Sequence, residues 1–440
     1  MLYVLAFMPT YVQWEVDELS RRGVPVSIVL PAPWPRAAMW EHITGFQRNG
    51  PHGPQVHTVD YRRWLRKPLR ALARPAASLL ITAWRRRRAA ALQLAVRCLR
   101  DGTFRSYLAA IWLCEVLAGE SARVAHRAGV GRAALRPRGG DAALVVGRVH
   151  AHFAGDAAEV GSLLAQLLGV PFSVTTHAND IFVPRVPQRV PRLLAAAAPA
   201  FTISHFNRAY LERVAGPAIG QHVRVLHLGV NADALPCWSP AAEVFTIVCT
   251  ASGLVEKKGL TVLLDACALV QASGLRFRCQ VCGADPAEQR LAELRSLVAA
   301  RGLAEVVSLL GALPWTEVQQ LVARADVFVL PAIRTAQGEM DGIPVSLMEA
   351  MGIGAPVIST QLSGIPELVE DGRSGLLVPP GDARALAGAI ERVARDPASA
   401  QAMGARARQR VRDAFSLARS VDELLAAWDE AGREYDRLQR

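Results

Sequence analysis

The sequence predicts an α/β protein with two doubly wound, Rossmann-like domains. Short apolar strands alternate with amphipathic helices in the first half of the chain, and the alternation restarts more regularly after residue 240. The length of 440 residues also exceeds what one hydrophobic core usually contains, because cores stop growing at roughly 250–300 residues. We therefore expect a first domain over residues 1–227 and a second over residues 228–415.

The first half opens with a strand at Leu2–Phe7 and a helix whose apolar face carries Val12, Val16 and Leu19. Val24–Leu30 is the next strand, and a proline-rich loop with an irregular segment follows to about residue 58. The remaining elements are a mainly helical region over 62–134, strands at Val145–His152, Phe172–Thr176, Phe201–Ser204 and Val223–Leu228, helices at Ala157–Leu168 and from about Asn207, and a linker at Val230–Pro240.

The second half repeats the alternation with shorter connections. Its expected strands are Phe245–Thr250, Phe277–Cys282, Val306–Leu310, Val327–Leu330, Val357–Ser359 and Gly375–Val378. Its expected helices are Gly259–Ala272, Ala287–Ala300, Trp315–Arg324, Pro344–Met351 and Ile365–Glu370. From about residue 383 to the end the chain is expected to be helical, with charged residues on one face.

Positive charge is concentrated in one region. The chain has a formal net charge of +11, but residues 61–138 alone hold 18 Lys or Arg and three acids, a net charge of +15. Arginines interleaved with aromatic rings suit the headgroup region of an anionic membrane, and a solvated helical face is the alternative interpretation. No nucleic-acid-binding motif accompanies the charge, so we expect no nucleic-acid partner. The aromatic residues among these arginines include Trp64, Trp84, Phe104, Tyr107 and Trp112.

The rest of the composition favours a cytoplasmic protein. Seven cysteines without regular spacing do not indicate a disulfide framework. The first ten residues, MLYVLAFMPT, lack the basic segment and cleavage site of a signal peptide and fit a first strand. No stretch reaches the ~20 apolar residues of a membrane-spanning helix. We expect a cytoplasmic location, with peripheral binding to the inner face of the cell membrane.

The strongest motif is GEMDGIPVSLMEAMGIGAPVIST, residues Gly338–Thr360. Two glycines allow a tight loop, and Pro344 suits the first position of a helix. The free amides of Gly342, Ile343 and Val345 would then form an anion site at the helix N-terminus. The motif therefore predicts a site for a phosphate or another anionic group.

Two carboxylates frame this motif. Asp341 lies in the loop, and Glu349 follows eight residues later, inside the helix. Carboxylates accept hydrogen bonds from hydroxyl groups, so one can bind sugar hydroxyls and the other a ribose diol. Either acid alone would be an ordinary surface residue, but the complete string argues against an ordinary loop and helix.

The same residues carry a family resemblance. DGIPVSLME resembles the acidic–seven–Glu signature of the retaining, GT-B-fold glycosyltransferases of group 1, also called family four. Ser252–Ala266, ADVFVLPA and Ser363–Asp382 resemble further segments of that family. In the first half, His150–Phe182 and Thr10–Gly23 resemble the colanic-acid-type exopolysaccharide branch. The resemblance implies two Rossmann-like domains facing a central cleft, and a last helix, 416–440, that crosses back to the first domain.

The resemblance also implies a function and its residues. We expect a glycosyltransferase that moves a sugar from a UDP- or GDP-sugar to a hydroxyl acceptor, possibly lipid-linked, with retention of configuration and without a metal. Lys258 would neutralise the diphosphate, and Asp341 and His177 would face the donor sugar from opposite domains. The implied donor contacts are Gly253, Lys258, Glu339, Asp341, Gly342, Ile343, Pro344, Val345 and Glu349, and the implied acceptor side is Thr10, His152, Asn179 and Asp180.

Some interpretations stay open. His150 and His152 share a strand face, but two ligands are too few for a metal. The family usually has Arg where this chain has Gly253. Either Lys258 and the helix N-terminus stabilise the diphosphate by themselves, or Arg334 or Lys257 substitutes. Alternatively, the chain is a homologue that binds a nucleotide sugar with weak or no catalysis. A soluble natural-product acceptor and a nucleotide-sugar epimerase are further alternatives.

Overall fold

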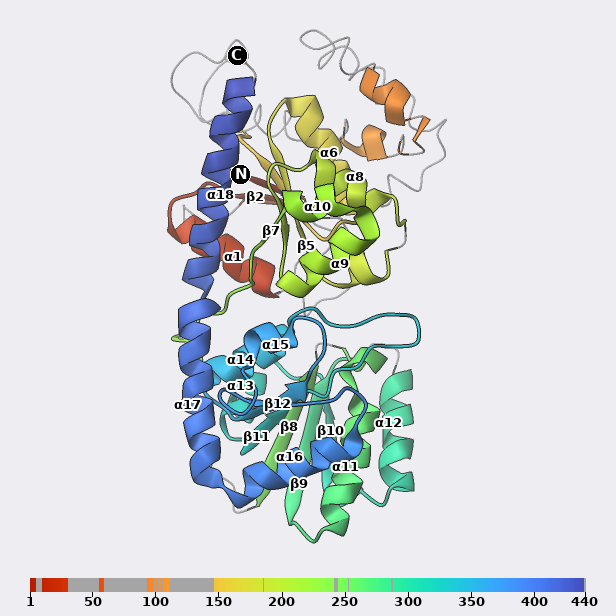
Figure 1. Cartoon of the computed structure of the whole chain (residues 1–440), viewed down its shortest axis with the longest axis vertical. Coiled ribbons are helices and arrows are strands. Elements are labelled where there is room, and N and C mark those ends of the chain that lie inside the picture. The colour runs from red at the N-terminus through yellow and green to blue at the C-terminus, as the bar shows by residue number, and fades with distance from the viewer. Residues whose placement is uncertain are drawn as a thin grey trace.

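The chain forms two α/β domains, each built on a fully parallel sheet (Figure 1). The computed structural model describes residues 1–4, 10–30, 55–58, 93–98, 100–101, 103, 106–110, 146–184, 186–240, 244–251, 253–285 and 288–438. Buried apolar residues form one large cluster in the second domain and two in the first, on opposite sides of the first sheet.

The first sheet has seven strands in the order β3-β2-β1-β4-β5-β6-β7. Its order reverses direction between β1 and β4, which is the doubly wound arrangement expected from the alternating pattern. The central strands β4 and β5 are buried along their whole length, as parallel strands covered on both faces should be. The strands are β1 Leu2–Val4, β2 Ser27–Leu30, β3 Gln55–Thr58, β4 Val149–His152, β5 Phe172–Thr176, β6 Ala200–Thr202 and β7 Val223–Val225.

The second sheet has six strands in the order β10-β9-β8-β11-β12-β13, with its reversal between β8 and β11. The strands are β8 Phe245–Ala251, β9 Phe277–Gly283, β10 Val307–Gly311, β11 Val327–Val329, β12 Val357–Thr360 and β13 Leu376–Val378. Ligands of such sheets bind beyond the carboxyl ends of the strands at the reversal point.

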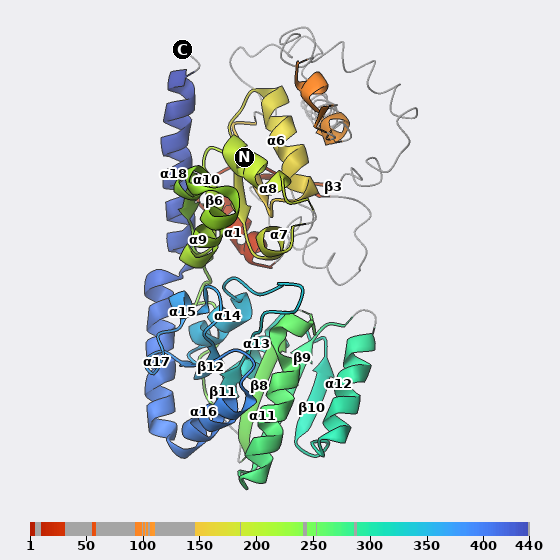
Figure 2. The same ribbon diagram turned by 45° about the vertical axis from the view of Figure 1, so that its right-hand side comes forward.

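Helices cover both sheets (Figure 2). In the first domain they are α1 Thr10–Arg21, α6 Asp156–Leu168, α7 Asn179–Phe182, α8 Arg189–Ala196, α9 His205–Ala215 and α10 Pro217–His222. In the second they are η3 Glu256–Lys258 (a 3-10 turn), α11 Leu260–Ala272, α12 Gln289–Ala300, α13 Trp315–Ala323, α14 Val345–Ile353, α15 Ile365–Leu368, α16 Ala383–Arg395 and α17 Pro397–Ala414.

The last helix, α18 Leu417–Leu438, runs alongside the first domain (Figure 1). Its residues Val421, Leu424 and Trp428 share a buried cluster with Val12 and Val16 of α1. The crossing chain is also fixed where Val230 and Ser416 form a parallel bridge. At 25 cal/mol per Å² of apolar area, burying each such side chain contributes ~1.5–3 kcal/mol, which explains why α18 holds this position.

Most expected elements are confirmed, and the differences have local causes. β3 and the short helices α7, α8 and α10 lack the long apolar periodicity that would have predicted them. Helix α14 begins at Val345, so Pro344 is its N-cap and not its first residue. Most of the basic region 61–138 lies outside the described residues, including Trp64, Trp84 and Trp112.

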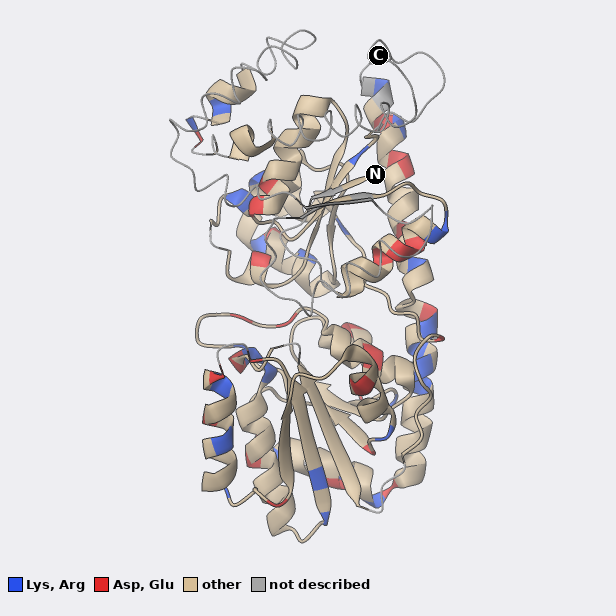
Figure 3. Cartoon of the chain, turned by 180° about the vertical axis from the view of Figure 1, so that it is seen from behind, with Lys and Arg blue, Asp and Glu red and all other residues tan. Residues whose placement is uncertain are grey.

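Charged residues lie mainly on the outer helices and on loops, whereas the strands carry few of them (Figure 3). Within the described residues, no helix combines the length and the apolar character that crossing a membrane requires. Many charged residues of the second domain and of α18 form ion pairs, such as Arg395 with Glu391 and Arg419 with Glu423.

Candidate functional site

The candidate site lies where the two domains meet, beyond the carboxyl ends of their strands. His152 ends β4, and His177 directly follows β5. In the second domain, Lys258 follows β8 and Asp341 follows β11, the two strands at the reversal point. The two domains face each other across this junction (Figure 2). The fold therefore brings four of the sequence-predicted residues to it.

Lys258 and Asp341 form a buried ion pair. The Lys258 ammonium donates a hydrogen bond of 2.7 Å to Oδ2 of Asp341, and each residue is 8% exposed. Burial alone would raise the pKa of Asp341, but the ammonium groups of Lys258 and Lys257 outweigh it and hold the pKa below the usual value. The pair is a fixed positive and negative charge at the entrance to α14.

Lys257 places a second ammonium group, besides that of Lys258, next to Asp341. Its Nζ lies 3.2 Å from Oδ1 of Asp341 and donates a 3.0 Å hydrogen bond to Oδ1 of Asn179 in the first domain. Lys257 and Arg334 are the two residues that could replace the arginine that the family usually has at Gly253. The structure places Lys257 beside Lys258, because both lysines pair with Asp341. Arg334 is exposed.

Gly259 explains why this lysine pair sits so close to the next strand. It has φ +67°, and a Cβ there would lie 1.8 Å from the carbonyl oxygen of Pro331. The amide of Ile333 also donates to the Lys257 carbonyl at 2.9 Å. The backbone of η3 is thus locked against the segment after β11, and both ammonium groups point to one place.

The N-terminus of α14 has free amides. The N–H groups of Gly342, Ile343 and Val345 find no acceptor among the described residues, as expected ahead of the first helical turn. The loop also packs closely against the first domain, since a Cβ at Gly342 would lie 2.9 Å from Cδ1 of Ile203. These amides and the lysine pair make a positively polarised site for an anion.

Glu349 is held by Trp315 of α13. The indole Nε1 donates a 2.7 Å hydrogen bond to Oε1 of Glu349, and burial raises the carboxyl pKa to about 7 although that bond lowers it. The Trp315 ring lies 5.7 Å from the ring of Trp14 in α1. The carboxylate expected to bind a ribose diol is therefore connected to the first domain through two indoles.

His177 belongs to a buried chain of polar groups. Its Nε2 lies 3.0 Å from Nδ1 of His152, and Nε2 of His152 lies 3.1 Å from Oε1 of Glu15. On the other side, Nδ1 of His177 lies 3.5 Å from the hydroxyl of Tyr11, and the ring stacks on Phe153 with centroids 4.2 Å apart. Burial, and then the nearby His152, hold the pKa of His177 well below its usual value.

The structure places Glu15 beside His150 and His152, the two histidines that were too few to bind a metal by themselves. Potential ligand atoms of Glu15, His150 and His152 lie within 4.8 Å of one another, all buried. The nitrogens of His150 nevertheless lie within hydrogen-bonding distance of Ser173 Oγ, at 2.8 Å, and Thr175 Oγ1, at 3.4 Å. Those of His152 contact Glu15 and His177, so each ring is part of a hydrogen-bond network.

The other residues expected on the acceptor side, Thr10, Asn179 and Asp180, differ in their exposure and contacts. Asp180 accepts hydrogen bonds from the amides of His177 and Ala154, so its carboxylate orders the backbone after β4 and β5. Thr10 is exposed at the start of α1, and Asn179 is exposed beside Lys257. Glu339 is half-buried, with its backbone tied to Thr335 in the loop before Asp341.

Glu367 joins the domains next to this site. Its carboxylate accepts hydrogen bonds from the amides of His205, at 2.9 Å, and Phe206, at 2.8 Å, at the N-terminus of α9. Nε2 of His227 lies 3.0 Å from the same carboxylate. A residue of the second domain thus caps a helix of the first.

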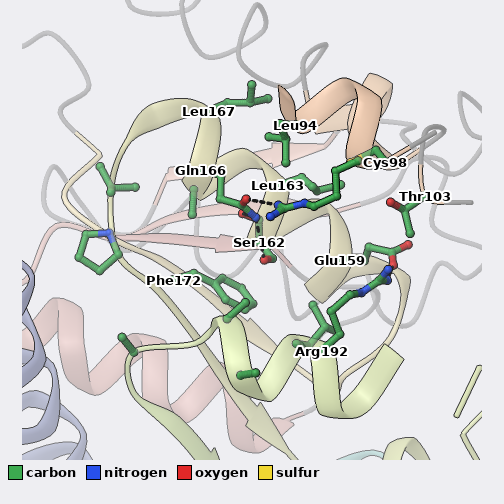
Figure 4. A pocket seen from close by; sticks show the side chains of 18 of the residues that line it. Leu94, Cys98, Thr103, Glu159, Ser162, Leu163, Gln166, Leu167, Phe172 and Arg192 are labelled. Carbon is green, nitrogen blue, oxygen red and sulfur yellow. Dashed lines mark hydrogen bonds and ion pairs between the residues drawn. The ribbon is translucent and has the colours of Figure 1, made fainter. Parts of the chain in front are cut away.

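Cavities occur at the domain junction and within the first domain. One of about 250 Å³ lies at the domain junction, between Trp14, Asp17, Trp315 and the linker residues Val230 and Leu235. The other, of about 970 Å³, lies at the opposite end of the first sheet, where β5 begins (Figure 4). Leu163, Phe172 and Leu193 line its apolar part, and Glu159 and Arg192 its polar part, far from the residues of the candidate site.

Sequence reasoning did not identify Glu15, Tyr11, Trp315 or Glu367. A signal existed for Glu15, which lies three residues after Val12 on the apolar face of α1, where an acid needs a buried partner. Trp315 and Glu367 act through contacts between segments far apart in the chain. Residue type alone does not predict such contacts.

Comparison with known proteins agrees with this geometry. Residues 239–410 match the family model "Glycosyl transferases group 1". The chain is 41% identical over 218 residues to the putative colanic acid biosynthesis glycosyltransferase WcaL of Salmonella typhimurium, covering 49% of this chain and 50% of the relative. It is 40% identical over 163 residues to the amylovoran biosynthesis glycosyltransferase AmsK of Erwinia amylovora, covering 37% and 39%. The chain thus spans about half or less of the length of these curated relatives.

Solved structures share the fold over the whole chain. The structure of Anabaena HepE in complex with UDP superposes with a TM-score of 0.67 at 17% identity, over 98% of this chain and 99% of that chain. At this identity the likeness concerns the fold alone. The protein has the GT-B fold, as expected.

Proposed function

We propose that this chain, whose residues 239–410 form a glycosyltransferase group 1 domain, transfers a sugar from a nucleoside diphosphate sugar to a hydroxyl acceptor. One observation carries the proposal. Lys258, Lys257 and the free amides before α14 converge beside Asp341, at the carboxyl ends of β8 and β11. That arrangement supplies positive charge for a diphosphate and a carboxylate for sugar hydroxyls.

The chemistry follows from where charge develops. Breaking the bond between the anomeric carbon and the diphosphate leaves negative charge on the departing nucleotide, and fixed donors stabilise it without reorganisation. Lys258, Lys257 and the amides of Gly342 and Ile343 would supply these donors. Because no divalent metal takes part in this mechanism, transfer should persist in the presence of a chelator.

We propose retention of configuration, with the departing phosphate taking the proton of the acceptor hydroxyl. On the opposite side, His177 closes the site from the first domain, where Gly342 approaches its carbonyl. Contact between the domains keeps water away from the donor, which would otherwise be hydrolysed.

The donor is a UDP- or GDP-sugar in this proposal. Glu349 would accept the ribose hydroxyls in place of the Trp315 indole. The structures of HepE with UDP and with UDP-glucose support a nucleotide-sugar donor by analogy of fold.

We propose that the acceptor belongs to exopolysaccharide assembly and is lipid-linked. The relatives WcaL and AmsK are named for colanic acid and amylovoran biosynthesis, which supports this class of acceptor. The net charge of +15 over residues 61–138 supports peripheral binding to an anionic membrane at its cytoplasmic face.

A donor-binding homologue without turnover is the second candidate, and Gly253 in place of arginine favours it. Lys257 beside Asp341 restores the second positive charge and argues for catalysis. Thermal unfolding against a panel of nucleotide sugars tests donor binding, since a ligand at 100 times its Kd stabilises by ~2.7 kcal/mol. Stabilisation by none of the UDP- or GDP-sugars would refute both candidates.

A further inference from the structure

We infer that His205, His227 and Glu367 form a binding site for Zn²⁺ or a similar transition-metal ion, and that the bound ion fastens the two domains to each other. The site is separate from the residues assigned to the nucleotide sugar. Binding of the ion does not depend on the proposed function, whereas an effect of the ion on turnover rests on it.

The three side chains come from segments far apart in the chain. His205 begins α9 of the first domain, His227 follows β7, and Glu367 lies in α15 of the second domain. Helices α9 and α15 lie on the two sides of the domain junction (Figure 1). One potential ligand atom of each residue lies within 4.8 Å of the other two. Two imidazoles and one carboxylate suit Zn²⁺ and its neighbours among the transition metals, whereas Mg²⁺ and Ca²⁺ prefer oxygen ligands alone.

Glu367 is already oriented as a ligand. Its Oε2 accepts a hydrogen bond from the amide of His205 at 2.9 Å, and its Oε1 accepts one from the amide of Phe206 at 2.8 Å. Burial would raise the pKa of Glu367, but hydrogen bonds from the His227 ring and from these amides hold it below its usual value. A carboxylate has about four lone-pair positions, so two amides leave room for a metal ion.

The ion would take the place of the hydrogen between His227 and Glu367. Nε2 of His227 lies 3.0 Å from Oε2 of Glu367. Two atoms that are each ~2.1 Å from a tetrahedral ion lie roughly 3.4 Å apart, so this pair needs little movement to bind one. Metal binding displaces a proton, so the step requires no particular charge on His227 beforehand. The His227 ring also packs against Phe415, with centroids 4.9 Å apart.

His205 completes the set from the solvent side. The residue is exposed, and its ring centroid lies 5.7 Å from that of His227. Within the part of the chain that the structure describes, the ring nitrogens of His205 have no hydrogen-bond partner, so the ring can turn toward an ion without breaking a bond. An exposed ligand also gives the ion an entry path, whereas Glu15, His150 and His152 are all buried.

The segment before α15 connects this site to the loop proposed to bind the diphosphate. The amide of Gly364 donates to the carbonyl of Gly342 at 3.3 Å, and a Cβ at Gly364 would lie 2.9 Å from Cβ of Ser204, just before α9. An ion that joins His205 to Glu367 would therefore hold that loop against the first domain. Since separation of domains often limits product release, we expect Zn²⁺ to slow turnover.

Binding is tested with the metal alone. The whole chain, without a histidine tag and stripped of metal with EDTA that is then removed, is titrated with Zn²⁺ by calorimetry and with Co²⁺ by visible absorption. We expect the tightest site to require His205. His205→Gln should lower its affinity roughly 100-fold or more, because even the loss of an outer contact to a metal ligand costs 10–100-fold. His222→Gln, which can still donate to the carbonyl of Ala197, is the control and should bind as the wild type does.

The link between the domains has its own measurement. Zn²⁺ should slow hydrogen–deuterium exchange in the peptide at the start of α9 of the wild type, and should not do so in His205→Gln. In a transfer assay, Zn²⁺ should lower kcat and EDTA should restore it, again only when His205 is present.

Each result decides a different point. Unchanged Zn²⁺ affinity in His205→Gln, or binding by the wild type only at millimolar Zn²⁺, would overturn the site. Tight binding without slower exchange at α9 would overturn the link between the domains. A protein that binds Zn²⁺ through His205 but transfers no sugar would refute the proposed function and leave the metal site standing.

Discussion

The indole of Trp315 donates a 2.7 Å hydrogen bond to the carboxylate of Glu349. The two residues lie on consecutive helices, α13 and α14, and the indole contacts Trp14 of the other domain. Burial raises the pKa of Glu349 to about 7, so its charge changes in the neutral range. The site expected to bind ribose is therefore sensitive to pH.

The first prediction concerns donor affinity. Ribose hydroxyls donate to a carboxylate better than to a carboxylic acid, so the affinity for UDP or GDP should rise as the pH increases through about 7. Isothermal titration calorimetry between pH 6 and pH 8 measures this change. Glu349→Gln should show weaker binding that does not vary with pH. An equal slope in both proteins would show that another group titrates.

The raised pKa of Glu349 predicts that the free energy of unfolding changes with pH in the opposite direction to the nucleotide affinity. The pKa of Glu349 is raised from 4.5 to about 7, so the folded protein favours the protonated acid. Without nucleotide, the free energy of unfolding should fall as pH rises from about 4.5 to about 7. Urea unfolding of the wild type and of Glu349→Gln at several pH values measures this change. The difference in the free energy of unfolding between the two proteins should be smallest at low pH.

The second prediction concerns the buried ion pair. Lys258→Gln should lower kcat/KM for the donor roughly 10–100-fold, because a charge-assisted contact to the diphosphate is lost. It should also destabilise the fold by about 1–3 kcal/mol, because Asp341 stays buried with only Lys257.

A double variant separates the two effects. Lys258→Gln/Asp341→Asn removes both charges, so most of the stability should return while the activity stays low. Urea unfolding and initial rates measure them independently. Wild-type turnover by folded Lys258→Gln would contradict the assignment of Lys258 to the diphosphate.

The third prediction concerns the contact between domains. Glu367→Ala removes the acceptor of the His205 and Phe206 amides, which should cost about 1–2 kcal/mol as for a lost helix cap. Hydrogen–deuterium exchange should become faster at the start of α9. Glu391→Ala, which removes an ion pair with Arg395 within α16, is the control and should leave that peptide unchanged. Unchanged exchange in Glu367→Ala would mean that the carboxylate does not cap α9 in solution.

The fourth prediction concerns the basic region. Each Lys or Arg near an anionic surface contributes ~1 kcal/mol, so a few should give reversible binding to vesicles rich in anionic lipid. Binding should weaken with salt, since the Debye length shrinks from ~8 Å at physiological ionic strength to ~3 Å at 1 M. Replacing Arg85, Arg86, Arg87 and Arg88 by Gln should reduce cosedimentation, and replacing them by Lys should not. Absence of wild-type binding at low salt would favour a soluble acceptor.

Much of the fold could be predicted because its strands are buried on both faces. Phe172–Thr176 is a strand with the expected bounds, since an uninterrupted apolar and hydroxyl run fits only a central position. Gln55–Thr58 has no such run, and its place at the sheet edge depends on pairing with β2. Short helices such as Pro217–His222 are formed by tertiary contacts that leave little periodicity.

The site could be predicted only in part. The positions of Lys258, Asp341 and His177 follow from motifs, but the Lys258–Asp341 pair joins residues 83 apart in the sequence. His152, which was expected on the acceptor side, contacts both His177 and Glu15, because β4 and β5 end at the same level and α1 packs beside them. Such relations depend on the packing of α1 and β4, which no local pattern encodes.

Transfer of labelled sugar is the measurement that tests the account most directly. Purified protein is incubated with labelled UDP- and GDP-sugars and a membrane lipid extract, and label in the lipid fraction is counted with and without chelator. We expect transfer from one donor by the wild type, little by Lys258→Gln and Glu349→Gln, and wild-type levels by Glu391→Ala. Donor binding without transfer to any acceptor, or equal transfer by wild type and Lys258→Gln, would contradict the account.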